Sequence, residues 1–553
     1  MTVRIRGNDY TVLRPPAIGS WTPALTVSVV VPAYNGQDKL DLVLAGLAAQ
    51  TYPQELLEVV VVDNGSAPAL RLGDVRPELT RLVACETPGR AAARNAGLAA
   101  ATGDVVHWLD SDIVLAPDEV EAHLRWHHLA PYLVITSHLR FTTAPLPSPR
   151  AVADGAAGLA ALFEPAEPHK WLVDLVERTG GLVGDPRRAF SLHIGGATSV
   201  GAALLKAAGP MDTELILGQD TELGYRLAQA GAVFVPDPEA RGYHLGPSMR
   251  MRDQDAIDRV SHAYIADRIP SYRWLRSHPA RQWKVPYVRA TVEPGGYDDV
   301  RATVDALLAG TVPDLVVDLP GPWSRLAPER RAPLTDPDLD LVLIKGHYLH
   351  EPRVRLTGEE PEPDTPEPYR LRLPAGWVPG EESLARLLDV AAEQGYGLVN
   401  VLLEETADGV VAARLERSAA FARAAIVAEP GEDVDDAVDD TFGVLWVDAE
   451  TYGFTPAEGA ATPTGRRTAY RARVAAEDEV ARLKKEAERL RGQIARWREE
   501  AGRWRKGAVE YRREIGTLRR ELAAAKKAQP VPRTGFAGAL RRALSRRRRG
   551  KAE

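Results

Sequence analysis

The chain has 553 residues, which is too many for one hydrophobic core, so about three units are expected. Its single cysteine, Cys85, excludes a disulfide-stabilised scaffold and agrees with a reducing, cytoplasmic compartment. The net charge is -7, yet residues 541–553 carry seven Lys and Arg against one acid; the remaining body is therefore strongly acidic and unsuited to nucleic acid. The sequence holds no run of 18 apolar residues and no apolar secretory core at its start, so we expect neither a membrane span nor a signal.

Alternating strand and helix patterns follow a short leader, residues 1–25. The β-branched runs Thr26–Val31 and Leu57–Val62 are typical of buried strands, and Lys39–Ala49 between them has helical spacing. This succession predicts a βαβ unit. The first domain, residues 26–265, is therefore expected to be α/β with a mixed, mostly parallel sheet.

A second, smaller α/β domain is expected over residues 280–460, and it echoes the first. Val304–Pro313 resembles Leu44–Pro53, and an apolar run ending in Asp follows each. Asp340–Pro352 (DLVLIKGHYLHEP) resembles GDVVHWLDSDIVLAP without its acidic pair. Two interpretations stay open: a degenerate duplicate of the first domain, or two unrelated units with common apolar patterning. The segment GEEPEPDTPEPYR predicts an exposed loop.

A strict heptad pattern occupies residues 475–527. Its core positions alternate spacings of three and four: Val480, Leu483, Ala487, Leu490, Ile494, Trp497, Ala501, Trp504, Ala508, Tyr511, Ile515, Leu518 and Leu522. The pattern predicts a coiled coil that joins copies of the chain into a homo-oligomer, and packing of this helix on the body is the alternative. The basic segment 528–553 would either contact the inner face of an anionic membrane or form a disordered tail.

Polar residues follow three expected strands of the first domain, at the carboxyl ends where open parallel sheets bind ligands. They are Tyr34 and Asn35 after the first strand, Asp63 after the second, and Asp110 and Asp112 after the strand that ends in HWL. Two carboxylates one residue apart repel each other. A divalent cation, Mg²⁺ or Mn²⁺, that also binds a diphosphate would offset this repulsion. For D-x-D alone, an acidic surface loop is the alternative.

Four motifs, in order, resemble the family-2 glycosyltransferases: VSVVVPAYNG, VVVVDNGS, GRAAARNAGLAAATGDVVHWLDSD and GPMDTELILGQDTELGYRLAQAG. The resemblance covers residues 26 to about 250. It implies a nucleotide-diphospho-sugar transferase-like (GT-A) fold, a nucleotide-diphospho-sugar donor, and transfer of the sugar to an acceptor hydroxyl with inversion. It identifies neither sugar nor acceptor; the basic tail is compatible with a cell-envelope or polysaccharide acceptor.

The resemblance also implies roles on the nucleotide side of the site. Tyr34 and Asp63 would contact the nucleobase, in a pocket shaped by Pro32 and Asn35. Arg94, in the ARNAG run, would reach the base or the phosphates. An arginine on the helix surface is the alternative for Arg94.

On the reacting side, the resemblance makes Asp112 the direct metal ligand and Asp110 a contact of the ribose or of the metal's water shell. His244 would approach the metal or the diphosphate, with a structural histidine as the alternative. Asp220 would be the catalytic base, supported by Glu222. The alternative for Asp220 is a helix N-cap.

Two further features concern the acceptor side. Gln219 stands where the family has the first acid of its pair, so no charge lies directly before Asp220. The run HIGGATSVGAALLKAAG resembles the family's segment under the acceptor, where Gly195 and Gly196 would let backbone approach the sugar. A simple turn at a strand end is the alternative for the two glycines.

The sequence therefore favours a metal-dependent inverting glycosyltransferase. A non-catalytic scaffold, with the fold used for binding and the coiled coil for assembly, is the alternative. Nucleotidyl transfer also uses acidic pairs on α/β sheets, but it usually has a Gly-rich loop with Lys or Arg after the first strand. PAYNGQDKL holds a single Gly.

Overall fold

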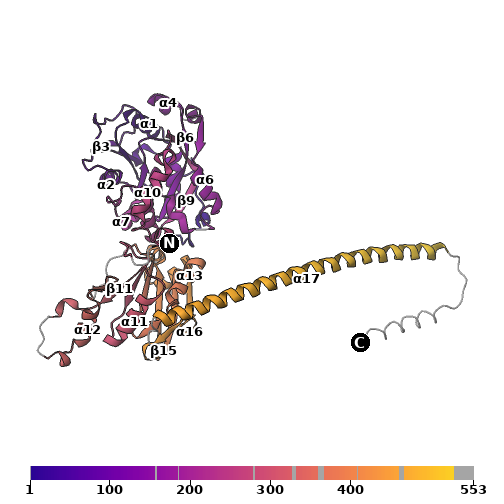
Figure 1. The fold of residues 1–553 in the computed structure, drawn as a ribbon. Coiled ribbons are helices and arrows are strands. Elements are labelled where there is room, and N and C mark those ends of the chain that lie inside the picture. The colour runs from indigo at the N-terminus through magenta and orange to yellow at the C-terminus, as the bar shows by residue number, and fades with distance from the viewer. Residues whose placement is uncertain are drawn as a thin grey trace, which may run out of the picture. The chain divides into compact units, whose positions relative to one another are not determined.

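The computed structural model describes residues 2–155, 158–184, 186–277, 281–326, 332–358, 366–407, 409–459 and 466–528. Met1–Ala460 form one compact unit with two mixed sheets, and Ala461–Glu553 form the other (Figure 1). The predicted fold class is confirmed: an α/β first domain with a mixed sheet, a smaller α/β domain and a long C-terminal helix.

The sheet of the first domain has the order β3-β2-β1-β4-β8-β6-β9-β5, with β7 paired to β6. Its strands are β1 (Val27–Ala33), β2 (Leu57–Asp63), β3 (Thr80–Ala84), β4 (Val105–Leu109), β5 (Ile113–Leu115), β6 (Leu133–Thr142), β7 (Ala166–Pro168), β8 (Ala197–Gly201) and β9 (Val233–Leu245). The first four strands of that order run parallel, as the βαβ pattern predicts, whereas β8 is antiparallel to both β4 and β6.

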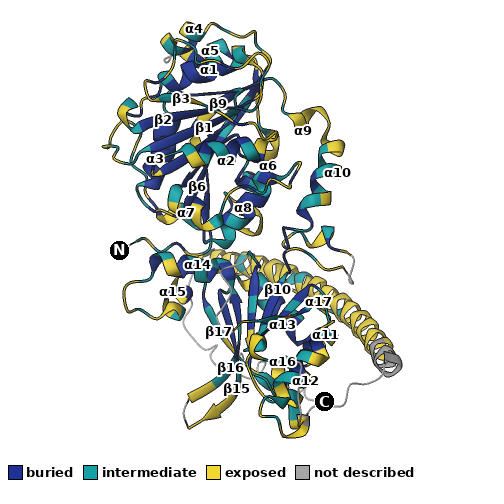
Figure 2. Cartoon of the chain, turned by 90° about the vertical axis from the view of Figure 1, so that its left-hand side faces the viewer, coloured by how far each residue is buried: buried dark blue, intermediate teal, exposed yellow. Residues whose placement is uncertain are grey.

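Alternate residues of the central strands face two different layers. Val29 and Val31 pack with α1 (Gln37–Ala48), whereas Val30 and Val62 pack with α2 (Arg90–Ala100). Gly97 lets α2 approach closely, because a Cβ there would overlap Val30. Strands buried on both faces explain the continuous apolar runs, and their dark colour in Figure 2.

The remaining helices of the first domain are α3 (Glu119–His127), α4 (Pro149–Asp154), α5 (Leu159–Leu162), α6 (Lys170–Arg178), α7 (Ala202–Ala208), α8 (Gln219–Gln229), α9 (Met249–Arg252) and α10 (Gln254–Ile265). The segment expected as a leader is packed against them. Ile5 is fully buried, and Asn8 exchanges side-chain hydrogen bonds with the backbone of Phe234 in β9.

The second sheet has the order β12-β11-β10-β13-β16-β15-β17. Its strands are β10 (Val288–Val292), β11 (Leu315–Pro320), β12 (Val354–Thr357), β13 (Tyr369–Leu373), β15 (Leu398–Thr406), β16 (Gly409–Arg417) and β17 (Val444–Asp448), and β14 (Trp377–Pro379) pairs separately with β18 (Phe454–Pro456). Its helices are α11 (Tyr297–Ala309), α12 (Leu339–Tyr348), α13 (Ser383–Gln394), α14 (Ser418–Val427), α15 (Val434–Thr441) and α16 (Ala449–Tyr452).

One comparison within the sequence is corrected by these elements. Asp340–Pro352 was matched to a strand and the acidic loop after it, but it forms most of helix α12. A short apolar run such as LVLI fits a helix as well as a strand, and periodicity alone does not separate the two.

The two domains contact each other through buried polar groups. Arg423 of α14 is 2% exposed and donates hydrogen bonds to the carbonyl oxygens of Gly231, Ala232 and Ile5. Burial lowers the pKa of Arg423 to about 10. Because the guanidinium satisfies buried carbonyl groups of the first domain, it fixes one domain against the other.

The second unit consists of one helix over the described residues, α17 (Arg466–Ala528). The helix by itself leaves its heptad core positions exposed, with Trp504 at 74%. Residues 529–553 of the basic tail lie outside the described residues. Among the described residues, no helix is both long and apolar enough to cross a bilayer.

Candidate functional site

A buried arginine joins the acidic groups at the rim of the first sheet. Arg94 of α2 is fully buried, and one of its terminal nitrogens donates to Asp110 Oδ1 at 2.7 Å and to the Gly195 carbonyl at 2.7 Å. The other terminal nitrogen contacts Asp220 Oδ1. Arg94 was expected to reach the base or phosphates, or else to lie on the helix surface. In the structure it instead holds two carboxylates from distant segments together.

The two glycines at the start of β8 lie against this cluster. Gly195 has φ +62°, and a Cβ there would overlap the Asp220 carboxylate and lie 2.6 Å from Arg94 Nη1. At Gly196 a Cβ would meet Ile113 Cδ1 at 3.2 Å and Asp110 Oδ2 at 3.4 Å. Glycine at 195 is thus required both by the backbone conformation and by the approach of the ion-paired groups.

Asp112 lies in a second group, between α1 and β9. Its Oδ2 is 3.5 Å from Lys39 Nζ, and its Oδ1 is 3.7 Å from His244 Nε2. Strand pairing aligns Ile113 with His244, which brings the carboxylate and the imidazole together. The Nδ1 atom of His244 lies 2.8 Å from the Gly246 carbonyl oxygen, so Nε2 faces Asp112. This pair of oxygen and nitrogen donors fits a divalent cation.

The residues assigned to the nucleobase form the loops after β1 and β2. Tyr34 is 68% exposed, Pro32 is half-buried, and Asn35 has φ +56°. The Asn35 N–H donates to Ser66 Oγ, which ties the two loops together. Asp63 is 9% exposed and accepts the N–H groups of Ser66 and Leu70, each at 2.9 Å. Burial would raise the pKa of Asp63, but these hydrogen bonds hold it below its usual value.

Arg90 was not among the residues selected from the sequence. It is the first residue of α2, one turn before Arg94, and it is exposed. The carboxylate of Asp110 raises the pKa of Arg90, with smaller contributions from Asp220 and Asp112, and burial opposes this rise. An exposed cation at a helix N-terminus beside this cluster suits a phosphate group. Its position after Gly89 at a helix start was the available signal.

The two acids of α8 face different partners. Asp220 is the second residue of the helix, whose N-cap is Gly218, so the N-cap alternative for Asp220 is wrong. Its side chain is 21% exposed beside Arg94. Glu222 pairs with Arg226 through both oxygens, at 2.7 and 2.8 Å. These contacts tie Glu222 to its own helix rather than to Asp220, whereas the sequence predicted that it supports Asp220.

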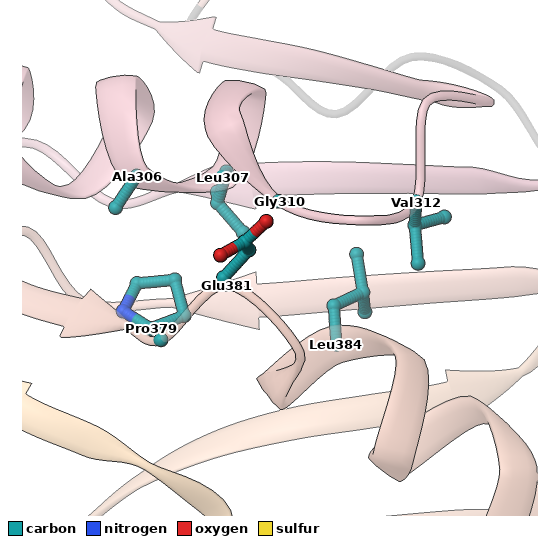
Figure 3. A pocket seen from close by; sticks show the side chains of 8 residues that line it. Ala306, Leu307, Gly310, Val312, Pro379, Glu381 and Leu384 are labelled. Carbon is teal, nitrogen blue, oxygen red and sulfur yellow. The ribbon is translucent and has the colours of Figure 1, made fainter. Parts of the chain in front are cut away.

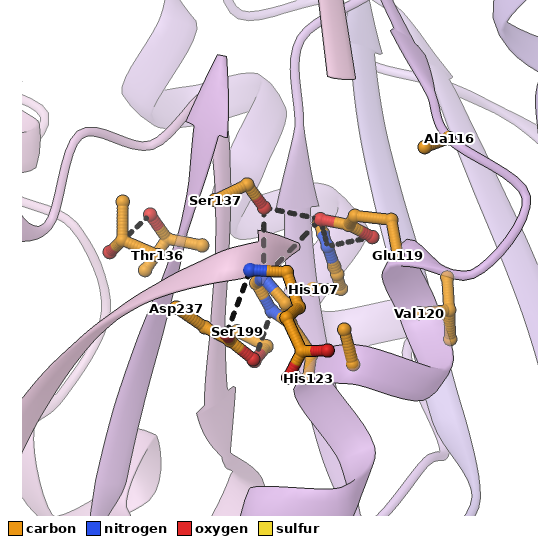
Figure 4. Close-up of polar contacts among 12 residues, drawn as sticks. His107, Ala116, Glu119, Val120, His123, Thr136, Ser137, Ser199 and Asp237 are labelled. Atoms are coloured by element: carbon orange, nitrogen blue, oxygen red, sulfur yellow. Dashed lines mark hydrogen bonds and ion pairs between the residues drawn. The ribbon is translucent and has the colours of Figure 1, made fainter. Parts of the chain in front are cut away.

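A separate polar cluster lies beneath β4. His107, Glu119 and His123 are fully buried, and their ligand atoms lie within 4.8 Å of one another (Figure 4). His107 Nε2 is 3.0 Å from Glu119, while His123 lies 2.7 Å from Ser199 and 2.8 Å from Ser137. Burial would raise the pKa of Glu119, but the two imidazoles lower it to about 2. These groups could ligate a cation, yet each already has a hydrogen-bond partner that fixes α3 to the sheet.

A comparison with known protein families matches the part of the first domain that forms this rim. Residues 28–175 match the model of glycosyl transferase family 2. This part of the first domain is therefore similar to that family. Its motifs supply the loops after β1, β2 and β4 described above, as the resemblance implied.

Curated relatives match less than half of the chain. The pre-mycofactocin glycosyltransferase of Mycobacterium tuberculosis is 29% identical over 224 residues, which are 39% of this chain and 42% of that protein. Glycosyltransferase AglE of Haloferax volcanii is 36% identical over 91 residues, or 16% of this chain and 30% of that one. The chain thus matches less than half the length of these relatives.

Solved structures with local similarity also cover less than half of the chain. The mannosyltransferase PcManGT of Pyrobaculum calidifontis, in complex with GDP-Man and Mn²⁺, is 21% identical, covering 46% of this chain and 66% of that one with a TM-score of 0.29. TarS of S. aureus, in complex with UDP-GlcNAc, is 19% identical, covering 44% and 65% with a TM-score of 0.31.

Substitution of Gly195 tests the packing of the carboxylate cluster. Gly195→Ala should lower the free energy of unfolding by more than ~1 kcal/mol, because the left-handed backbone alone costs about that much and the new methyl group displaces Asp220. Gly196→Ala is the matched control, since its methyl group meets neighbours at 3.2 Å or more. Denaturant unfolding measures both, and equal effects would contradict the packing described here.

The buried histidine next to Asp220 predicts a pH dependence. His193 Nδ1 lies 2.8 Å from the Asp220 carbonyl oxygen, and burial lowers the pKa of His193 to about 4. Between pH 6.5 and 4 the unfolded chain binds a proton that the folded chain does not. The free energy of unfolding should therefore fall as pH is lowered through this window, by up to about 3 kcal/mol for this residue.

His193→Asn keeps a donor for the Asp220 carbonyl but does not titrate. Urea unfolding at pH 7 and pH 4.5 should show a smaller loss of stability for this variant than for the wild type. The other buried histidines titrate in both proteins, so the difference between the two losses isolates His193. Identical losses would mean that His193 is protonated in the folded protein.

Proposed function

We propose that the first domain transfers a sugar from a nucleotide-diphospho-sugar to an acceptor hydroxyl, with inversion at the anomeric carbon. The observation that carries the proposal is the Arg94 cluster, in which Asp110 after β4 and Asp220 at the start of α8 lie on one buried guanidinium. A fold used only as a scaffold has no need for this arrangement around two glycines. The family of the domain and the glycosyltransferase relatives support the same activity.

On the donor side, the nucleobase lies at the loops that carry Tyr34 and Asp63, and Arg90 contacts the phosphates. Asp112 and His244 would hold a divalent cation, Mg²⁺ or Mn²⁺, and this cation would supply positive charge for the diphosphate. Lys39, 3.5 Å from Asp112, adds a further positive group beside the leaving diphosphate. Asp110 is fixed by Arg94 and faces the ribose or the water shell of the cation.

On the acceptor side, Asp220 is the base. The acceptor oxygen attacks the anomeric carbon, its proton passes to the Asp220 carboxylate, and the bond from that carbon to the diphosphate oxygen breaks. The nucleoside diphosphate departs from the opposite face with the electron pair of that bond. Arg94 fixes one oxygen of Asp220, which orients the carboxylate for this transfer.

The C-terminal helix gives the protein its assembly. We propose that heptad positions of α17 from two or more chains pack together, because the helix by itself leaves thirteen core positions of a strict 3.5-residue repeat without a partner helix. The basic tail would then bring several positive segments to one anionic membrane surface. The acceptor class is compatible with the cell envelope.

Neutralising either acid tests the activity. Asp220→Asn and Asp112→Asn should each lower transfer by about 10²–10⁴-fold, because the first loses the proton acceptor and the second a cation ligand. A panel of nucleotide sugars with Mn²⁺ or Mg²⁺ identifies the donor, and product formation measures the rate. Glu239→Gln is the control, since that exposed carboxylate pairs with Arg125 in the same domain. Activity that survives chelation and both substitutions would exclude this mechanism.

Removal of the C-terminal helix tests the assembly. A chain that ends at residue 459 should lose the oligomeric mass of the full chain in light scattering, while residues before it keep their fold. Replacing Leu490 and Ile494 with Asp in the full chain should dissociate it equally. An unchanged mass in both cases would place the contact elsewhere.

A further inference from the structure

The two domains of the first unit share one chain path through their sheets. The orders β3-β2-β1-β4-β8-β6-β9 and β12-β11-β10-β13-β16-β15-β17 have the same sequence of directions: three parallel pairs, two antiparallel pairs and one parallel pair. The short strand after the fourth pairs antiparallel with a late strand in both, β5 with β9 and β14 with β18.

Loop hydrogen bonds repeat at matching places. The N–H that opens α7 donates from Ala202 to the Asp104 carbonyl, and the N–H that opens α14 donates from Ser418 to the Pro368 carbonyl. Thr51 donates to Pro117 in the first domain, as Thr311 does to Glu381 in the second. Such coincidences in irregular segments favour a duplication over two unrelated units.

The loops that contain Thr311 and Glu381 border a small pocket. Figure 3 shows Gly310 and Glu381 around this pocket of about 10 Å³, which has room for one water at most. It is therefore not a ligand site.

The register also locates the acidic pair in the second copy. Val105 pairs with Gly201, the residue before α7, and Tyr369 pairs with Arg417, the residue before α14. With Val105 aligned to Tyr369, Asp110 corresponds to Pro374, because each lies five residues further on. Asp112 corresponds to Gly376, because each lies seven residues further on. The second copy has neither carboxylate. It does not hold a donor in the way proposed for the first.

The copies differ most on one face of the sheet. In the first domain α2 covers this face, with Gly97 against Val30. In the second domain, few residues between β12 and β13 are described. They are residue 358 and residues 366–368, and none of these four is helical. Helices α11, α12 and α13 all pack with the apolar residues of the opposite face.

The residues at the centre of this face are polar, and α14 and α15 pack at one end of it. One register row crosses the sheet through six strands: Asp318, Thr291, Arg372, Arg414, Asn400 and Trp446. The matching row in the first domain has Val60, Val30 and Trp108 at its centre, under α2. The face that is an apolar core in one copy thus carries hydrogen-bonding groups in the other.

A cavity of about 450 Å³ lies on this face. Its charged lining is balanced, with three cations and three acids: Arg370, Arg372, Arg414, Glu293, Glu416 and Asp435. Arg414 is held by Asp435 through two hydrogen bonds, at 2.7 and 2.8 Å, and by Glu416 at 3.2 Å. Because the charges cancel, a strongly anionic ligand such as a diphosphate gains little here, whereas a neutral ligand with many hydroxyl groups meets both donors and acceptors.

Two further groups lie on the same row, next to Arg414. Asn400 is 1% exposed, and its Oδ1 has no hydrogen-bond partner among the described residues. Trp446, in register with Asn400, is 55% exposed. Neither residue lines the cavity itself, and the Asn400 oxygen is enclosed by the protein. The exposed indole of Trp446 offers a flat apolar surface for the C–H face of a sugar ring at the margin.

We propose that this face of the second domain binds a neutral saccharide. The guanidinium and carboxylate groups of the cavity bind its hydroxyls, and Trp446 packs against a ring at the margin. The site is distinct from the donor site of the first domain. It makes the second copy a carbohydrate-binding module built on a duplicated transferase frame.

Ligand-observed NMR on the full chain tests the proposal. The probes are the methyl glycosides of glucose, galactose, mannose and N-acetylglucosamine, at millimolar concentration. At least one should give saturable binding that weakens about tenfold in Arg372→Ala, the effect of one lost hydrogen bond to a charged group. Trp446→Ala should weaken it similarly without changing the unfolding temperature, because that side chain is mostly exposed.

Substitutions in the first domain separate the two sites. The same binding should persist in Asp112→Asn and Asp220→Asn, whose changes are confined to the transferase rim. Binding that disappears in these variants but not in Arg372→Ala belongs to the first domain and overturns the proposal. Failure of all four glycosides, or displacement of the bound glycoside by inorganic pyrophosphate, overturns it as well.

Discussion

The candidate active site depends on the ion pairs of one buried guanidinium. Arg94 lies at zero exposure between Asp110, Asp220 and the carbonyl of Gly195, so its charge is compensated by two carboxylates and a backbone oxygen. A buried charge without such partners costs several kcal/mol, which means that the rim cannot lose one acid without strain on the rest. The glycine at 195, the close approach of α2 to the sheet and the start of α8 all serve to bring these groups together.

The second domain shows what the same frame becomes without this interaction. It keeps the strand order, the directions and several loop hydrogen bonds. The segment between β12 and β13, residues 358–368, holds no arginine, and Pro374 and Gly376 occupy the places of the acids. With no arginine to compensate, carboxylates at that rim would only repel each other. This sheet face instead carries paired Arg, Asp and Glu side chains, such as Arg414 with Asp435 and Glu416, which are compatible with water.

Much of the first domain could be predicted from the sequence. The strands β1 and β2 are buried on both faces, and β1, α1 and β2 all lie within a few residues of the expected bounds. The candidate residues at strand ends could be selected because the carboxyl ends of parallel strands all lie at the same edge of the sheet. The partner of Arg94 could not be found in this way, because Asp220 is 126 residues away and no local pattern encodes that approach. Glu222 was predicted to support Asp220, but in the structure it pairs with Arg226, one helical turn away.

In the second domain the apolar pattern identified α/β elements but misplaced one of them. The segment that contains LVLI was matched to a strand of the first domain but forms α12, because four apolar residues fit either structure. Register in the sheet, which sequence does not display, was needed to align Pro374 and Gly376 with the acidic pair. The polar face was also hidden, because Arg370, Arg372 and Arg414 look like ordinary outward residues of alternating strands.

A crystal structure of the full chain with Mn²⁺ and a nucleoside diphosphate tests the central claim most directly. We expect the diphosphate between Asp112 and Arg90, with Arg94 still paired to both Asp110 and Asp220. A structure in which Arg94 leaves the two carboxylates to bind the nucleotide, or in which the nucleotide lies away from this rim, would contradict the account.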